Sequence, residues 1–328
     1  MKMMLPNLRP VTVMTIINLK KNKHLIVVAG PTAIGKTALG IRIAKHFDTD
    51  IISADSRQFF REMSIGTAKP DVSEMQGITH HFIDSHSIAE AYNVGKYEAE
   101  AIALLDKLFS TKDIVIMVGG SGLYIDAVCK GFDELPEASP EIRRKLDGLL
   151  ETEGIEALQQ LLKELDPVYY EQVDLQNPQR IGRALEVCLA GGEPYSTLRK
   201  GKAKQRHFNI IKIGLNTSRD VLYDRINNRV DEMMQQGLLE EVKQLVDHKQ
   251  ANALQTVGYK ELFDYLENKT DLQTATALIK QNTRKFAKRQ LTWFRRDPEM
   301  QWFEPGQVDD IIGYIESKCH VAGNGTAP

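Results

Sequence analysis

Eight consecutive residues near the start of the chain have the types and spacing needed to hold a phosphate group. They are Gly30, Pro31, Thr32, Ala33, Ile34, Gly35, Lys36 and Thr37, and they match the pattern GxxxxGK[ST]. Glycines let backbone amides turn toward phosphate oxygens, and a helix that begins here adds the positive end of its dipole. Lys36 can reach between two phosphates, and the Thr37 hydroxyl can ligate Mg²⁺. This segment predicts a site for a diphosphate or a triphosphate, the alternative being a glycine-rich turn without a ligand.

One acidic residue is placed to act beside this loop. Enzymes that transfer a terminal phosphoryl group usually carry a carboxylate at the end of a neighbouring strand, where it binds Mg²⁺. The apolar run Ile114 to Val118 ends instead in four residues without a carboxylate, Gly119 to Gly122. Asp55 follows another apolar run and is the only acid at a strand end near the loop. Its role is open between a metal ligand, a proton-accepting base and a helix cap or turn residue.

The elements that must position these residues alternate between strands and helices. Short apolar and β-branched runs predict buried strands at 25–29, 50–54 and 114–118. Spacings of four between apolar residues predict helices, which we place at 38–47 and 89–109. Strands that alternate with helices pair in parallel, so the sequence predicts an α/β fold with a parallel sheet flanked by helices.

The middle of the chain departs from this alternation and reads as helices alone. We expect helices at 140–153, 155–165 and 178–190, because Pro178 suits a first turn and Gly191 with Gly192 suits a helix end. A strand at 208–214 and helices at 218–247 and 272–296 follow. The predicted organisation is a discontinuous catalytic core at 24–132 and 207–316, an all-helical insertion at 133–206, a disordered extension at 1–23 and a loose tail at 317–328.

Composition and local charge narrow the classes of function. The 328 residues are 42% apolar and 26% charged, which is typical of a soluble globular protein of about two structural units. The net charge is only −2, yet seven basic residues and no acid lie between Lys280 and Arg296, which favours local contact with a polyanion. We expect Ile279, Phe286, Leu291 and Phe294 to form the buried stripe of that helix. Three cysteines without CxxC spacing argue against a structural zinc and favour a reducing, cytoplasmic setting.

Further motifs follow the loop in a characteristic order between about Leu25 and Phe303. They are Ser53-Ala-Asp-Ser-Arg-Gln58, Ile65-Gly-Thr-Ala-Lys-Pro70, Gly119-Gly-Ser-Gly-Leu-Tyr124, Asn177-Pro-Gln-Arg-Ile-Gly-Arg183, Val257-Gly-Tyr259 and Lys288-Arg-Gln-Leu-Thr-Trp-Phe-Arg295. With the phosphate loop, this set resembles the tRNA dimethylallyltransferases. The resemblance implies Mg²⁺-assisted transfer of a dimethylallyl group from its diphosphate to the exocyclic amine of adenosine 37, next to the anticodon of tRNA. It also implies a P-loop NTPase-like core related to small-molecule kinases, with the insertion gripping the anticodon stem-loop.

This resemblance implies roles for individual residues. Asp55 would accept a proton from the amine of a base flipped out of the anticodon loop, and Thr32 would touch the diphosphate or the transferring atom. The eight loop residues would bind the diphosphate, with Mg²⁺ on Thr37. Arg225 and Arg229 would add positive charge, since residues four apart share a helix face, although a solvated charged face is the alternative. The tRNA would contact Asp55, Ser56, Arg57, Gln58, Ser121, Arg143, Gln179, Arg180, Ile181, Gly182, Arg183, Val257, Gly258, Tyr259, Lys260, Lys288, Arg289, Gln290, Trp293 and Arg295.

Four positions depart from the family pattern. Ile34 stands where serine is common, which matters little because only backbone amides act there. Ser121 replaces the usual threonine and keeps its hydroxyl. Gln255 and Lys260 flank Val257-Gly-Tyr259 at positions that are often arginine, which predicts a weakened or re-routed phosphate contact.

Three other functions stay open at this stage. A nucleotide or small-metabolite kinase would share the phosphate loop and Asp55, and an adenylate isopentenyltransferase would share the donor. An RNA-binding module without catalysis would leave the loop without a purpose. The insertion and the basic segment favour a macromolecular acceptor. We therefore expect tRNA and dimethylallyl diphosphate as partners of a cytoplasmic monomer, with no membrane and no obligate protein partner.

Overall fold

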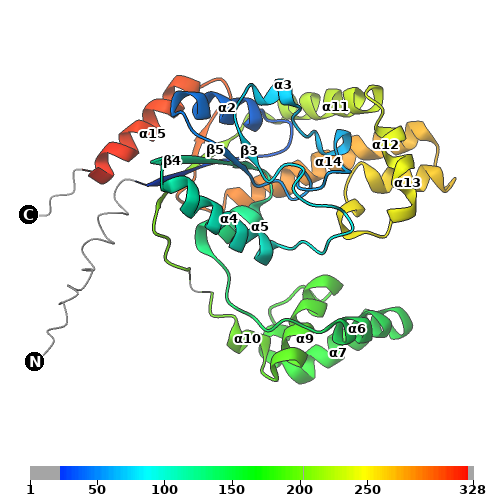
Figure 1. Cartoon of the computed structure of the whole chain (residues 1–328). Helices are drawn as coiled ribbons and strands as arrows, with labels where there is room; N and C mark the ends of the chain where they lie inside the picture. Colours follow the sequence, from blue (N-terminus) through cyan, green and yellow to red (C-terminus); the bar gives the residue numbers. More distant parts are fainter. Residues whose placement is uncertain (1–22, 202, 324–328) are drawn as a thin grey trace, which may run out of the picture. The chain divides into compact units, whose positions relative to one another are not determined.

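A six-stranded sheet forms the centre of the larger part of the protein. The computed structural model describes residues 23–201 and 203–323 (Figure 1). The strands follow the order β3-β2-β4-β1-β5-β6. They are β1 (His24–Ala29), β2 (Ile51–Ser53), β3 (His80–His81), β4 (Ile114–Gly119), β5 (Asn209–Leu215) and β6 (Gln301–Phe303). All neighbouring strands pair in parallel, which confirms the predicted α/β class.

This strand order brings the reactive segments to one edge of the sheet. Because parallel strands end on the same side, the residues after β1, β2 and β4 meet at their carboxyl ends. These residues are the phosphate loop at 30–37, Asp55 and the Gly119–Gly120 turn. Every residue of β1 is buried, as a strand in the middle of a sheet covered on both faces requires.

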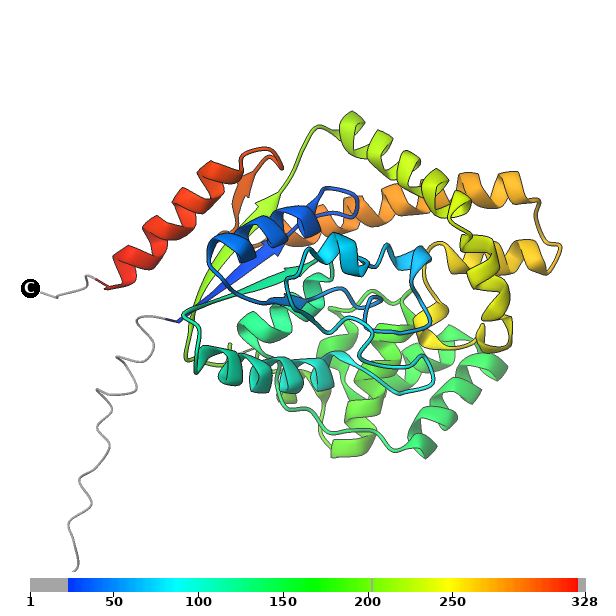
Figure 2. The ribbon, with the colours of Figure 1, turned by 45° about the horizontal axis from the view of Figure 1, so that its top comes forward.

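Helices cover both faces of the sheet, and side chains of β1 point alternately into two apolar cores. Leu25 and Val27 belong to one core, whereas Ile26 and Val28 belong to the other. The helices of this part are α2 (Lys36–His46), α3 (Val72–Met75), α4 (Val94–Phe109), α5 (Gly122–Lys130), α11 (Arg219–Gln235), α12 (Leu238–Gln244), α13 (Tyr259–Leu266), α14 (Leu272–Phe294) and α15 (Val308–Gly323), with 3-10 turns η1 (Ile65–Thr67), η2 (Val246–His248) and η3 (Asn252–Leu254). The first core is packed by α4, α13 and α14, and the second by α2, α11 and α15 (Figure 2).

The second compact unit covers Lys130–Gln205, and the remaining described residues form the first unit. Its helices are α6 (Pro140–Glu153), α7 (Ile155–Leu165), α8 (Pro167–Tyr170), α9 (Pro178–Gly191) and α10 (Tyr195–Leu198). They enclose a core of their own that includes Leu158, Leu162 and Leu185. Near the unit's two ends, the amide of Lys204 donates to the carbonyl of Lys130 at 2.7 Å. The predicted bounds of the insertion, 133–206, differ from this division by a few residues.

A buried carboxylate fastens the last helices of this second unit. Asp166 is completely buried and accepts hydrogen bonds from the amide of Tyr169 at 2.9 Å and the amide of Ser196 at 2.7 Å. The Ser196 hydroxyl donates to it as well, at 2.7 Å. Asp166 therefore joins the start of α8 to α10. Its three hydrogen bonds compensate for the cost of burying a charged group.

Two predicted helices have different bounds in the structure. The helix expected at 89–109 begins only at Val94, because Asn93 caps it by accepting a hydrogen bond from the amide of Lys96 at 3.0 Å. The helix expected at 218–247 breaks after α11. Gly237 there adopts a left-handed conformation with a φ of 101° and starts α12 in a new direction.

The predicted tail at 317–328 is wrong for the residues that the structure describes. Residues 317–323 continue α15, since Ile311, Ile315 and Cys319 follow at spacing four and contact the second core. Residues 324–328 and the predicted extension up to residue 22 lie outside the described residues. In the described chain, none of the helices is long and apolar enough to cross a membrane.

Candidate active site

The phosphate loop connects β1 to α2 and is anchored by its own residues. Ile34 is fully buried in the second core, and Gly35 takes a φ of 102°, which side chains other than hydrogen disfavour. The Lys36 ammonium bends back and donates a hydrogen bond to the carbonyl of Pro31 at 2.7 Å. The loop therefore has a fixed backbone that surrounds a cationic side chain.

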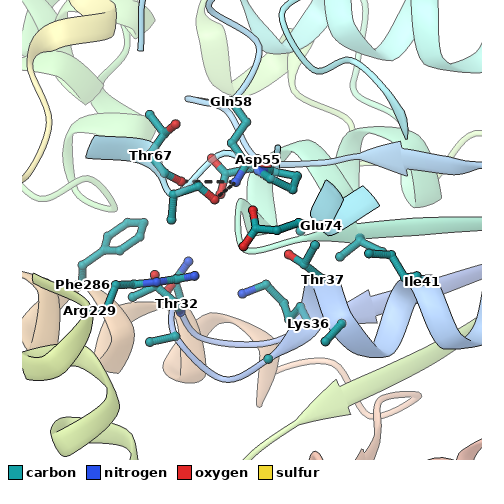
Figure 3. A pocket seen from close by; sticks show the side chains of 18 of the residues that line it. Thr32, Lys36, Thr37, Ile41, Asp55, Gln58, Thr67, Glu74, Arg229 and Phe286 are labelled. Atoms are coloured by element: carbon teal, nitrogen blue, oxygen red, sulfur yellow. Dashed lines mark hydrogen bonds between the residues drawn. The ribbon is translucent and has the colours of Figure 1, made fainter. Parts of the chain in front are cut away.

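A cavity of about 400 Å³, called the phosphate cavity below, lies against this loop (Figure 3). Thr32, Ala33, Gly35, Lys36 and Thr37 line one side. The other lining residues used below are Asp55, Gln58, Thr67, Ala68, Glu74, Arg229, Phe286 and Gln290. The structure thus brings the predicted loop, Asp55 and Arg229 together, as the sequence led us to expect.

Two cations in this cavity are short of neutralising charge. Burial lowers the pKa of Lys36 to about 8; the negative charge of Asp55 opposes this change and the positive charge of Arg229 adds to it. Burial also lowers the pKa of Arg229, although Asp55, Glu232 and Glu74 partly compensate. Because both side chains have lost hydration that the nearby acids do not fully replace, an anion bound between them would be stabilised.

Arg225 and Arg229 have different positions relative to the loop. Arg229 lines the phosphate cavity, and its guanidinium points toward Thr32 in Figure 3. Arg225 lies one helical turn earlier and donates to the carbonyl of Ile34 at 3.2 Å. Arg225 thus supports the backbone of the loop, whereas Arg229 is available to a ligand.

Asp55 is positioned by the turn that follows β2. One of its oxygens accepts a hydrogen bond from the amide of Arg57 at 3.0 Å. The amide of Ser56 donates to the Ser121 hydroxyl at 3.0 Å, and that hydroxyl donates to the Ser56 hydroxyl at 3.1 Å. Ser121, predicted as a tRNA contact, therefore ties the turn after β2 to the turn after β4.

A second cavity of about 190 Å³, called the apolar cavity, adjoins the first. Six residues line both cavities: Thr32, Asp55, Thr67, Ala68, Arg229 and Phe286. The far wall of the apolar cavity is formed by Ile226, Val230, Met233, Leu238, Val257 and Ile279. One ligand could therefore place an anionic end beside the loop and an apolar end against this wall.

Phe286 does not belong to the buried stripe that the sequence predicted. Its side chain remains 39% exposed and lines both cavities, while Ile279 and Phe294 are buried as expected. The helical spacing was correct, but at this turn the inner face of α14 borders a cavity and not packed side chains.

The buried side chain of Gln290 connects the phosphate loop to the turn after β4. It was predicted as a tRNA contact, but it is only 7% exposed. Its carbonyl oxygen accepts a hydrogen bond from the amide of Thr32 at 2.9 Å, and its amide donates to the carbonyl of Gly120 at 2.9 Å. Gln290 therefore positions the phosphate loop, a role that requires contacts too distant in sequence to be predicted.

Two further residues predicted to contact tRNA have buried side chains. Ile181 is fully buried in the core of the second unit, and Tyr259 is fully buried in the first core. Their side chains are on the inward faces of α9 and α13 and do not reach the surface, so the predicted contact of these two residues with tRNA stays a prediction. Gly258, before Tyr259, is largely buried and lines the apolar cavity together with Val257, whereas Lys260 is exposed.

The other predicted tRNA residues lie at surfaces or at cavity edges. In the second unit, Gln179 and Arg180 are exposed, Gly182 is half-buried, and Arg143 and Arg183 both pair with Glu186, at 3.4 and 3.0 Å. In the first unit, the exposed residues are Lys288, Arg289, Trp293 and Arg295. Trp293 donates to Asp126 at 2.9 Å. Arg57 lines the apolar cavity, donates to the carbonyl of Asn252 at 3.2 Å and has a pKa lowered by burial.

Not every basic side chain between Lys280 and Arg296 is available to a polyanion, because some contact neighbouring side chains. Lys280 pairs with Asp231 of α11, and Arg284 donates to the side-chain oxygen of Asn227 on the same helix at 2.6 Å. The exposed cations are those nearer the end of α14. Only this later part of the segment offers its charge to a polyanion.

The residues of the phosphate cavity fit Mg²⁺. Within residues 23–201 and 203–323, no group of three or more His, Cys, Asp or Glu residues could hold a metal. Mg²⁺ does not need such a group, because it is usually bound by one or two carboxylates, waters and substrate phosphates. The Thr37 hydroxyl and the carboxylates of Asp55 and Glu74 line this cavity (Figure 3). Sequence analysis missed Glu74, whose carboxylate also accepts from the amide of Asp71 at 3.0 Å.

Comparisons with known proteins agree over most of the chain. A family model described as IPP transferase matches residues 58–297. A tRNA dimethylallyltransferase of Christiangramia forsetii is 55% identical over 300 residues, or 91% of this chain and 99% of that protein. The full-length tRNA isopentenylpyrophosphate transferase of Bacillus halodurans is 35% identical, with a TM-score of 0.69 over 92% of this chain and 98% of that one. A eukaryotic dimethylallyltransferase acting on tRNA is 25% identical, with a TM-score of 0.76 over 92% and 80%.

Raising the pH through about 8 should weaken the binding of inorganic diphosphate. The lowered pKa of Lys36 means that its ammonium form predominates below about 8 and its neutral form above. Because the ammonium attracts the anion, binding above this pH must take up a proton and loses affinity. Titration calorimetry over this range, with Lys36→Met as the control for the ligand's own ionisation, measures the effect. Equal pH slopes for both proteins would contradict it.

Removing the side-chain amide of Gln290 should loosen the phosphate loop. Gln290→Leu keeps the size of the side chain but leaves the Thr32 amide and the Gly120 carbonyl without their partner. We expect the affinity for inorganic diphosphate to fall about 5- to 100-fold. Gln281→Leu, an exposed position on the same helix, is the matched control and should bind as the wild type does. Unchanged affinity of Gln290→Leu would rule out this positioning role.

Proposed function

The chain belongs to the IPP transferase family, that of the tRNA dimethylallyltransferases, and we propose that it transfers a dimethylallyl group from dimethylallyl diphosphate to tRNA. The acceptor is the exocyclic amine of adenosine 37, and diphosphate is released. Family membership confirms the resemblance noted in the motifs. The observation that carries the proposal is the junction of a cationic cavity and an apolar cavity at Asp55 and Thr32.

The two cavities suit a prenyl diphosphate. Residues of the loop, including Lys36, line the phosphate cavity together with Arg229, and there backbone amides and these two cations would hold two phosphates. The apolar wall of the second cavity would place aliphatic side chains against a short hydrocarbon. The reacting carbon of the donor would then lie near Thr32 and Asp55, which line both cavities.

The chemistry requires charge stabilisation and the removal of one proton. Adenine's exocyclic amine is a weak nucleophile because its lone pair is delocalised into the ring, whereas an allylic carbon loses diphosphate readily. The carbon–oxygen bond of the donor breaks, a carbon–nitrogen bond forms, and the amine proton passes to the Asp55 carboxylate. Lys36, Arg229 and the loop amides hold the negative charge of the leaving diphosphate. Thr37, with Glu74 beside it, would hold Mg²⁺, which would supply further positive charge to that diphosphate.

The tRNA would be held by exposed residues of both units. Gln179, Arg180 and Arg183 on α9, with Arg143 on α6, offer donors to an anticodon stem-loop. Lys288 and Arg289 on α14, and Arg295 directly after it, would offer positive charge to its phosphates. Ser56, Arg57 and Gln58 lie beside Asp55, where an extruded base would arrive. We propose that the enzyme acts in the cytoplasm, where its substrate tRNA resides. We also propose that it acts as a monomer without an obligate protein partner.

Product analysis with alternative acceptors tests the proposed function. The protein is incubated with dimethylallyl diphosphate, Mg²⁺ and either hypomodified tRNA or free AMP, and the nucleosides are then identified by mass spectrometry. We expect isopentenyladenosine at position 37 of the tRNA and no prenylated AMP. Prenylation of AMP alone would indicate an adenylate isopentenyltransferase, and transfer of label from the γ-phosphate of ATP would indicate a kinase.

Asp55→Asn should slow transfer without preventing donor binding. The amide cannot accept the amine proton, so we expect turnover to fall by roughly 10²–10⁴-fold, the usual contribution of a general base. The affinity for inorganic diphosphate should change little. Asp106→Asn, an exposed acid on α4, is the matched control. If turnover of Asp55→Asn stayed near the wild-type value while Mg²⁺ affinity collapsed, Asp55 would be a metal ligand and not the base.

A further inference from the structure

Glu241 gathers an unusual number of hydrogen bonds for a residue that no motif includes. Its carboxylate on α12 accepts from three consecutive backbone amides: Ser64 at 3.0 Å, Ile65 at 2.7 Å and Gly66 at 3.0 Å. The hydroxyl of Tyr259 donates to the same carboxylate at 2.6 Å. Successive amides that converge on one carboxylate form an anion-binding turn, here occupied by a side chain of the protein itself.

The turn that Glu241 holds carries one wall of the active site. Thr67 and Ala68, the next residues along the chain, line both the phosphate cavity and the apolar cavity. Their carbonyls each accept a hydrogen bond from the Gln58 amide at 3.2 Å. Gln58 follows Asp55 by three residues. The position of this turn is therefore linked to the position of the base.

Tyr259 fills the space behind the turn. A side chain at Gly66 would place its first carbon 2.5 Å from the Tyr259 ring, so only glycine allows this approach. Burial and the negative charge of Glu241 raise the pKa of Tyr259, and its hydroxyl keeps the proton that it donates. Ring, turn and carboxylate form one packed group, called the Glu241 clamp below.

The Glu241 clamp also connects the turn to the cation of the opposite wall. α12 follows α11 after a short break at Gly237, and α11 carries Arg229. The carboxylate on α12 thus bonds to the wall that contains Thr67, while the preceding helix presents Arg229 to the same cavity. Through this connection the distance between the diphosphate-holding cation and the Asp55 turn would be kept constant.

We propose that Glu241 is a positioning residue for prenyl transfer, which fixes the Thr67–Ala68 wall between Arg229 and Asp55 without touching the substrate. This inference rests on the proposed function. In Glu241→Gln, an NH₂ group replaces one of the two acceptor oxygens and meets one or two backbone amides that can only donate, so the wall keeps only part of its anchor. Misplacement of reacting groups by about 1 Å can cost 10²-fold in rate, whereas the phosphate loop itself would be unaffected.

The test compares Glu241→Gln with Glu240→Gln, whose carboxylate is exposed on the same helix and pairs only with Lys243 in the described chain. Three quantities are measured: turnover of dimethylallyl transfer to tRNA, affinity for inorganic diphosphate, and hydrogen exchange of the amides of residues 64–68. For Glu241→Gln we expect turnover to fall about 10- to 100-fold, unchanged diphosphate affinity and faster exchange at these amides. Tyr259→Phe, which removes one of four donors, should show a smaller loss of turnover.

Each result decides between the possible explanations. If Glu241→Gln and Glu240→Gln turn over equally, the positioning role is wrong. If diphosphate affinity falls as far as turnover, Glu241 is a general structural residue and the inference is also wrong. If Glu241→Gln does not fold, the smaller change Tyr259→Phe decides, by the same split between turnover and affinity. If the wild type transfers no prenyl group to tRNA, the proposed function fails, and unchanged exchange at residues 64–68 would independently disprove the clamp.

Discussion

The site depends on two cations that have lost much of their water. Lys36 and Arg229 face one cavity, and in both cases burial is the main cause of a lowered pKa. Such groups are stabilised only when an anion replaces their hydration, which is the property that a diphosphate-binding site needs. Their positions follow from the parallel sheet, whose central strand delivers the loop to the edge, and from α11, which approaches that edge from a distant part of the sequence.

Hydrogen bonds between distant loops set the shape around these cations. Gln290 connects the loop after β1 to the turn after β4, and Ser121 connects that turn to the segment of Asp55. Glu241 connects the wall at Thr67 to α12. None of these three side chains needs to contact a substrate in order to matter. The reactive residues are thus held by a polar framework that joins the loop after β1, the Asp55 segment, the wall at Thr67, the turn after β4, α12 and α14.

Local patterns in the sequence predicted those parts of the fold and site that local physics determines. α6 and α7 have the predicted bounds, and the phosphate loop lies between a strand and a helix as expected, because periodicity and glycine positions specify such elements. The strands β3 and β6 were missed because they are short and, unlike the similarly short β2, contain no β-branched residues. Gln290, Phe286 and Glu74 were misjudged or missed because burial and cavity lining arise from tertiary contacts. The three-dimensional structure is needed to show which turn of α14 borders the cavities.

The insertion has a structural property that bears on how the family could diversify. Its two ends are joined by the hydrogen bond between Lys204 and Lys130, and it encloses an apolar core and a buried carboxylate of its own. An inserted domain whose two ends lie close together can be replaced by another domain, while the flanking elements α5 and β5 are retained. Evolution, or a protein engineer, could therefore replace this segment while the parallel sheet and its phosphate loop are inherited unchanged.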